Sequence, residues 1–180
     1  MTSPTPLSSA VVDVVGRPFR AIWTPEDGAL RAGGFATDAD PGADRLIARL
    51  ERLDPALAAR GLAAAPATDG PVVDALRAYA GGDLTAIDAI PVAQPETPFR
   101  GEVWRALRRV PGGRAVTYTE LATLAGRPAA VRAAASGCAN NLVALVVPCH
   151  RIVRADGGLG GYLFGADLKE RLLRHEGALR

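Results

Sequence analysis

The sequence predicts an α/β fold with a small N-terminal lobe, built from an antiparallel sheet and helices, and a mostly helical C-terminal lobe. Two short apolar runs flank a turn signal early in the chain, apolar residues recur at helical spacing further on, and a proline-rich stretch separates halves of opposite charge. With 180 residues, of which 48% are hydrophobic, the chain is long enough to bury a core but short for two independent enzymatic domains.

The sheet is expected in the N-terminal lobe, residues 1–90. Residues 1–10 are small, polar and proline-containing, which is typical of a frayed terminus, so order is expected to begin near Val11. The apolar runs Phe19–Trp23 and Ala29–Phe35 flank the turn sequence TPEDG. This arrangement indicates a β-hairpin and hence a small antiparallel sheet.

Two amphipathic helices and a linker are expected next. Apolar positions at helical spacing predict helices over Ala43–Leu53 and Pro71–Tyr79. The stretch PVAQPETP, residues 91–98, is the best candidate for a linker. The second domain is therefore expected over residues 99–180.

Three helices are predicted in the first part of that domain. One apolar face from Phe99 to Val110 predicts a helix that ends before a Pro-Gly-Gly turn. Thr119 is expected to cap a short helix that ends at Gly126. Pro128 is expected to start another helix that runs to about Cys138. Two short helices at this spacing are typical of a helix-turn-helix.

The rest of the domain is expected to hold a buried strand and a last helix. The uniformly apolar run Leu142–Val147 favours a buried strand, which Pro148 interrupts. Asp167 followed by Glu170 is typical of a helix start, and Gly177 of its end.

Charge separates the two halves of the chain. Residues 1–90 carry 8 Arg against 12 acidic residues, whereas residues 91–180 carry 12 Arg and one Lys against 7 acidic residues. The halves thus have net charges of −4 and +6, so the C-terminal half is the one suited to a phosphate backbone.

The cysteine and histidine content excludes several classes of protein. Cys138 and Cys149 are the only cysteines, and no charged segment precedes the first apolar run, so both are expected to be free thiols in a reducing compartment. With two histidines and no CxxC pair, no metal site is expected. The longest strongly apolar run is far below the roughly 20 residues that cross a bilayer, so no membrane partner is expected.

The chemistry is expected at the sequence Pro148-Cys149-His150-Arg151, where a thiol is followed by an imidazole and a guanidinium. A thiol is weakly nucleophilic until nearby positive charge or a proton acceptor makes the thiolate available. A buried structural cysteine is the alternative that the residues alone leave open, and a cysteine hydrolase that uses the same two side chains is another.

The surrounding sequence resembles a known family. Residues 97–177 contain PCHR at 148–151, Gly161-Tyr162, Asn141 eight residues before the cysteine, and Thr117-Tyr118 upstream. They closely resemble the C-terminal domain of the methylated-DNA–protein-cysteine methyltransferases, in particular their inducible bacterial branch. The resemblance implies a DNA repair protein that irreversibly transfers the alkyl group, mainly methyl, from O6-alkylguanine in DNA to Cys149, in one turnover and without a cofactor.

The resemblance also implies roles for four further residues. His150 takes the thiol proton through a water molecule, and Glu176 orients the imidazole. Tyr118 donates a hydrogen bond near N3 of the leaving guanine, where it stabilises developing negative charge. Asn141 acts as a hinge that fastens the second helix of the pair to the active-site segment. The alternatives are that Glu176 is solvated and that Tyr118 only packs in the core.

DNA contacts are expected from the helix pair, because a base inside a duplex must rotate out of the stack before a thiol can reach it. By resemblance, Arg132 fills the vacated space. The small side chains of Ala130 and Ala133 allow approach to the minor groove, and Thr117 and Arg151 are expected to contact the DNA. An alanine-rich packing helix with one exposed arginine is the alternative.

The alkyl pocket is expected to be shaped by residues from three segments. They are Cys138, Pro148, Ile152, Tyr162, Leu163 and Phe164. For Cys138, a plain core thiol is the alternative. Phe164 is expected to narrow the pocket, so that methyl is preferred over bulky O6 substituents.

The resemblance implies a monomer in the bacterial cytoplasm whose partner is double-stranded DNA containing O6-alkylguanine, with no obligate protein partner. A protein that binds and flags alkylated DNA without reacting is the alternative. It is disfavoured because Cys149, His150 and Glu176 are all present.

Overall fold

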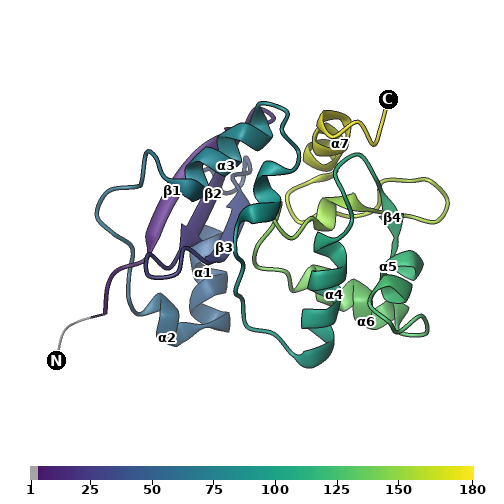
Figure 1. The fold of residues 1–180 in the computed structure, drawn as a ribbon, viewed down its shortest axis with the longest axis horizontal. Helices are drawn as coiled ribbons and strands as arrows, with labels where there is room; N and C mark the ends of the chain where they lie inside the picture. Colours follow the sequence, from purple (N-terminus) through teal and green to yellow (C-terminus); the bar gives the residue numbers. More distant parts are fainter. Residues whose placement is uncertain (1–3) are drawn as a thin grey trace. The chain divides into compact units, whose positions relative to one another are not determined.

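The computed structural model describes residues 4–180 of the chain. It contains two compact units, one that extends to Pro95 and one from Glu96 to Arg180 (Figure 1). The first combines an antiparallel sheet with helices and the second is mostly helical, which confirms the predicted α/β class.

The sheet of the N-terminal unit has the order β1-β2-β3, with strands β1 (Ser8–Val14), β2 (Arg17–Trp23) and β3 (Leu30–Phe35), all antiparallel. The predicted hairpin is confirmed as β2 and β3. The expectation that order begins near Val11 was wrong, since β1 pairs from Ser8, opposite Trp23. The polar serines hid this strand start, although Ser9 and its neighbour Ala10 are both buried.

Helices α1 (Asp44–Leu53) and α3 (Pro71–Ala80) confirm the two helices predicted in this unit. α3 packs against β1 and α1 packs beside β3 (Figure 1). The short helix α2 (Pro55–Ala58) was not predicted, because four residues are too few to show a period; the side chain of Asp54 caps it. A 3₁₀ turn, η1 (Ala86–Ala89), follows α3.

The C-terminal unit contains four α-helices, one 3₁₀ turn and two short strands. They are α4 (Pro98–Arg108), β4 (Val116–Thr117), α5 (Tyr118–Leu124), α6 (Val131–Ala139), η2 (Cys149–Arg151), β5 (Ile152–Val153) and α7 (Ala166–His175). β4 and β5 pair in parallel, which joins the start of α5 to the segment directly after η2. No helix within residues 4–180 has the length and apolarity to cross a membrane.

Several local predictions for this unit were wrong in detail. Thr117, not Thr119, caps α5, because the Thr117 hydroxyl and the Glu120 carboxylate form a reciprocal capping box. α6 starts at Val131, not at Pro128. Asp167 lies inside α7 and does not cap it, since Gly165 precedes the helix.

The run Leu142–Val147 is buried as predicted, but it is not a strand. It forms a series of turns, in which Leu145 has a positive φ of 69°. Uniform apolarity reports burial without fixing backbone conformation, so the strand prediction failed although burial was correct.

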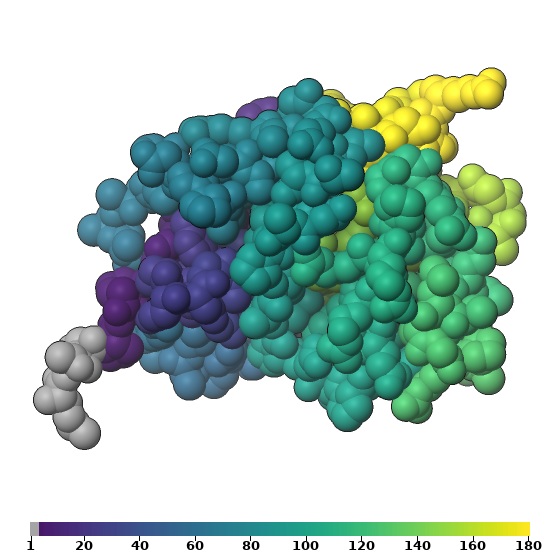
Figure 2. Space-filling model, in the orientation of Figure 1, coloured from purple at the N-terminus to yellow at the C-terminus, as the bar shows by residue number. Residues whose placement is uncertain are grey.

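In the core of the C-terminal unit, α6 packs closely against α4 at Gly137. The indole Nε1 of Trp104 donates to the carbonyl of Gly137 at 3.0 Å. A Cβ on Gly137 would lie 3.1 Å from Cγ1 of Val103, so glycine permits this close approach. Because Cys138 follows Gly137 in α6, this packing fixes the position of Cys138 relative to α4. On the surface of this unit, the exposed residues 154–158 protrude as a loop, yellow-green in Figure 2.

Candidate active site

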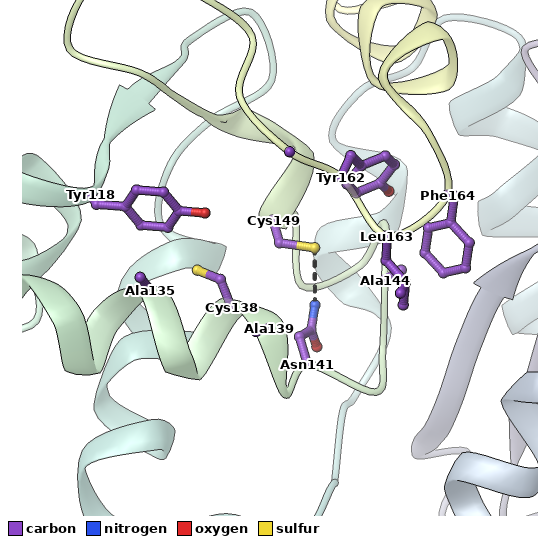
Figure 3. A pocket seen from close by; sticks show the side chains of 11 residues that line it. Tyr118, Ala135, Cys138, Ala139, Asn141, Ala144, Cys149, Tyr162, Leu163 and Phe164 are labelled. Carbon is purple, nitrogen blue, oxygen red and sulfur yellow. Dashed lines mark hydrogen bonds between the residues drawn. The ribbon is translucent and has the colours of Figure 1, made fainter.

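The Asn141 side chain braces the segment that leads to Cys149. Its Nδ2 donates to the carbonyl of Val147 at 2.9 Å, and its Oδ1 accepts from the backbone N–H of Val143 at 3.0 Å. The same Nδ2 lies 3.5 Å from Sγ of Cys149 (Figure 3). This amide replaces the ladder bonds that a strand would have made, and it gives the sulfur a hydrogen-bond donor.

Cys149 opens into a cavity of about 260 Å³. The lining side chains come from α5 (Tyr118), α6 (Cys138) and the loop before α7, and the ring of Tyr118 points toward Cys149 in Figure 3. Tyr162 and Phe164 form an edge-to-face pair with ring centroids 5.4 Å apart. The thiol thus lies in a partly open, mostly apolar pocket in which a planar ligand has aromatic neighbours.

His150, the residue after Cys149, forms a buried pair with Glu176. Nε2 of His150 lies 2.9 Å from Oε1 of Glu176, and both side chains have no exposed surface. Burial lowers the pKa of His150, although Glu176 opposes this effect, so the imidazole is neutral near pH 7. Burial alone would raise the pKa of Glu176, but the hydrogen bonds from His150 and Arg151 outweigh it and lower that pKa.

Arg151 does not lie where a DNA contact requires it. Its side chain is buried, with 1% of the residue exposed, and its guanidinium binds Glu176 and the carbonyl of Val110. The expectation that Arg151 contacts DNA was therefore wrong. The sequence analysis named Glu176 as a partner of His150, but not as a partner of Arg151, 25 residues away in the chain.

The other residues expected to contact DNA lie on or before α5 and α6. Arg132 and Ala133 are exposed on α6, and Ala130 at its N-cap is half-buried. Thr117 is half-buried at the N-cap of α5. The structure therefore leaves these four residues accessible at the surface.

The pocket contains four of the six residues expected there. Cys138, Tyr162, Leu163 and Phe164 line it, and Leu163 is 65% exposed. Pro148 and Ile152 do not line it: both are buried, and Ile152 pairs with β4. These two were placed by proximity to Cys149 in the chain, which does not determine the direction of a side chain.

The two thiols differ in environment. Burial, with a smaller effect of Cys149, raises the pKa of Cys138 to about 12, so Cys138 stays protonated near neutral pH. Cys149 has the hydrogen-bond donor from Asn141 and is partly exposed to the pocket. Cys138 is therefore part of the pocket wall, and Cys149 is the better nucleophile of the two.

Sequence reasoning missed Lys169. It is 2% exposed, and its Nζ donates to the carbonyl of Gly161 at 3.3 Å. Burial lowers the pKa of Lys169, while interactions with Cys149 and Cys138 act in the opposite direction. Lys169 is the one lysine in a chain with 20 arginines, which sets the position apart but does not indicate that its amine is buried. Within the part of the chain that is described, no cluster of side chains is suited to hold a metal ion.

Together, the fold and the site define a protein with a cysteine that faces a pocket, a buried histidine–glutamate pair and a short helix pair beside the pocket. Residues 98–178 match the family described as 6-O-methylguanine DNA methyltransferase, DNA binding domain. The C-terminal unit of the chain is thus similar to members of the 6-O-methylguanine DNA methyltransferase family.

Similar proteins extend this result. The chain is 46% identical over 110 residues to the methylated-DNA–protein-cysteine methyltransferase of Shigella flexneri, which covers 61% of this chain and 64% of that relative. It is 52% identical over 80 residues to the bifunctional transcriptional activator/DNA repair enzyme Ada of Escherichia coli, a match that covers 44% of this chain and 23% of Ada. The matched region is thus under two thirds of the length of either relative.

Solved structures resemble almost the whole chain. The O6-methylguanine methyltransferase of Mycobacterium tuberculosis superposes with a TM-score of 0.71 at 27% identity, over 96% of this chain and 93% of that one. A structure of the protein from the same organism in complex with DNA gives a TM-score of 0.72 at 26% identity, over 95% and 93% of the two chains. Both lobes therefore share the fold of that enzyme.

Proposed function

We propose that this protein repairs DNA by transferring the alkyl group, mainly methyl, of O6-alkylguanine irreversibly to its own Cys149. The observation that carries the proposal is a pocket-facing thiol that accepts a hydrogen bond from Asn141 and is followed in the chain by a buried His150–Glu176 pair. The related proteins are named for this reaction.

The reaction proposed is one displacement. His150 removes the thiol proton through a bridging water, and the Cys149 thiolate attacks the alkyl carbon. A sulfur–carbon bond forms as the carbon–oxygen bond breaks, and the electron pair stays on guanine O6. Tyr118 points toward this region of the pocket, where its hydroxyl is suited to donate toward N3 and stabilise the charge on the leaving base.

The DNA is proposed to bind at the α5–α6 pair, which acts as a helix-turn-helix that approaches the minor groove. The exposed Arg132 fills the space that the rotated nucleotide leaves, and Ala133 beside it allows a close approach. Replacing Arg132 by alanine is then expected to slow the reaction with duplex DNA much more than with the free O6-methylguanine base. The protein is proposed to act as a monomer in the bacterial cytoplasm.

The deciding experiment measures intact protein mass after incubation with a duplex that contains one O6-methylguanine. Methylation adds about 14 Da, the difference between a methyl group and the hydrogen that it replaces, and never more than one equivalent. Cys138→Ala is expected to keep the gain and Cys149→Ala to lose it. These two variants are a matched pair, because both sulfur atoms line the same pocket.

Two results would contradict the proposal. A mass gain that survives Cys149→Ala would assign the acceptor elsewhere. Lesion-selective binding without a mass gain would show a protein that flags alkylated DNA and does not repair it.

A further inference from the structure

Arg151 is among the largest fully buried side chains, and the reaction proposed above does not use it. Its Nε donates to Oε2 of Glu176 at 3.0 Å and its Nη2 donates to Oε1 at 2.8 Å. Its Nη1 donates to the carbonyl of Val110, two residues after the end of α4, at 2.6 Å. A guanidinium is costly to bury unless its donors are paired. Three of the five N–H groups of Arg151 donate to these acceptors.

The bidentate contact fixes the carboxylate that holds His150. Oε1 of Glu176 accepts from both Arg151 and the histidine ring. An ionised carboxylate can only accept hydrogen bonds, so Nε2 of His150 must carry the proton that it donates. The other ring nitrogen, Nδ1, is then an acceptor. It is buried, and no protein group within residues 4–180 hydrogen-bonds to it.

We propose that Arg151 is a positioning residue of the active site, which clamps both oxygens of Glu176 so that His150 presents a neutral ring with Nδ1 ready to accept a proton. The proposal rests on the proposed function only for the source of that proton, the Cys149 thiol. A lysine at this position would keep the charge, but it would lose the planar fork that holds two carboxylate oxygens at once.

The charges around His150 give the inference a measurable consequence. Burial lowers the pKa of the ring, Glu176 raises it, and Arg151 and Lys169 lower it. These groups come from η2, from α7 and from its C-cap. Without the Arg151 charge, the Glu176 carboxylate attracts a proton on His150 more strongly, so the pKa of His150 must rise.

The test is an NMR titration of the protein without DNA, in which the ring nitrogens of the two histidines are observed. In the unaltered protein, His150 is expected to be protonated on Nε2 and to titrate below 6.5, the ordinary value for histidine. In Arg151→Gln, the midpoint is expected to rise by about one pH unit. In Arg151→Lys it is expected to stay close to the original value.

The control is Arg174→Met, which removes an exposed arginine from α7 that pairs with Glu170. This change is expected to leave the His150 midpoint in place. The rate of methylation should depend on the variant in the same way as the His150 midpoint. In Arg151→Gln, the acid limb of the pH–rate profile is expected to move to higher pH. A purely structural role would lower the rate at every pH without that displacement.

Two outcomes would overturn the inference. One is an unaltered protein in which His150 carries its proton on Nδ1, a measurement that holds even if the variants do not fold. The other is a folded Arg151→Gln in which the His150 midpoint does not move. Failure of the proposed function is seen separately, because the titration needs no substrate and the mass experiment needs no variant of Arg151.

Discussion

Replacing Asn141 by alanine removes the brace that positions the Cys149 sulfur. The side chain is part of a buried residue, 4% exposed, and it bonds the backbone of Val143 and of Val147. It also supplies a donor to Sγ at 3.5 Å. The substitution therefore acts on both the stability of the segment and the state of the thiol.

The structure separates the costs of this substitution. The Val143 N–H loses the acceptor that it has in Asn141, and an unsatisfied buried donor costs about 1–3 kcal/mol. The Val147 carbonyl keeps a second bond, from Cys149 N–H, so its loss is only that of an ordinary hydrogen bond, about 1 kcal/mol. We expect the free energy of unfolding to fall by about 2–4 kcal/mol.

The effect on the reaction follows from the lost contact with sulfur. A hydrogen bond to a charged group contributes about 1.5 kcal/mol or more, which corresponds to about a tenfold slower methylation of Asn141→Ala. Denaturant unfolding and the time course of the mass gain measure the two quantities.

Asn140→Ala is the matched control, because within residues 4–180 the Asn140 side chain bonds only to Ser136, to its carbonyl and, more weakly, to its hydroxyl. The control is expected to lose about 1 kcal/mol or less and to react at the original rate. If the two variants unfold within about 0.5 kcal/mol of each other and react equally fast, the brace does not have the role assigned to it.

Three further predictions concern pH, backbone and pocket size. Because the pKa of His150 is lowered, its neutral form stabilises the fold above pH 6.5 and this contribution is lost as the pH falls below 6.5; unfolding free energies at pH 5 and pH 7.5 should show the loss, and His150→Gln should reduce it. Gly113 and Gly157 have nearly equal φ of 87° and 86°, but of these two only Gly113 would bring an added Cβ close to a neighbour, the Glu176 carbonyl at 3.1 Å. Gly113→Ala should therefore lower the free energy of unfolding by about 1 kcal/mol more than Gly157→Ala, as measured by denaturant unfolding. Equal losses in the two variants would disprove that contact. Phe164 lines the pocket beside Tyr162 and is proposed to narrow it, so Phe164→Gly should be inactivated faster by O6-benzylguanine base, and equal rates would show that this ring does not limit substituent size.

Local signals were sufficient for the hairpin and for most helices. The β2–β3 hairpin lies within one continuous stretch, where the two apolar runs and the turn residues between them were both visible. The turns of Leu142–Val147 were not visible, because their conformation depends on a side chain, Asn141, that supplies the hydrogen bonds of a strand partner. Composition indicated that this run is buried, but tertiary bonding determined its shape.

The site was predictable where chemistry is local and unpredictable where it depends on distant partners. The resemblance named Cys149, His150 and Glu176, and the structure brings the last two together at 2.9 Å. Arg151 was misjudged because an arginine is usually exposed, and only the fold shows the carboxylate that buries it. Lys169 was missed because a cation on an amphipathic helix gives no sign in the sequence that its amine is buried.

The arrangement of charges explains how a low-dielectric pocket tolerates a thiolate. In the proposed reaction, moving the Cys149 proton to His150 creates two charges inside the protein, a step that burial opposes. Each new charge has an opposite neighbour already in place: the thiolate interacts with Lys169, and the imidazolium bonds to Glu176. Arg151 balances Glu176 before the transfer, so the carboxylate is not an unpaired buried charge in the resting protein. After proton transfer, each negative group thus lies next to a positive one, and the fold already holds the Lys169, Glu176 and Arg151 charges in place.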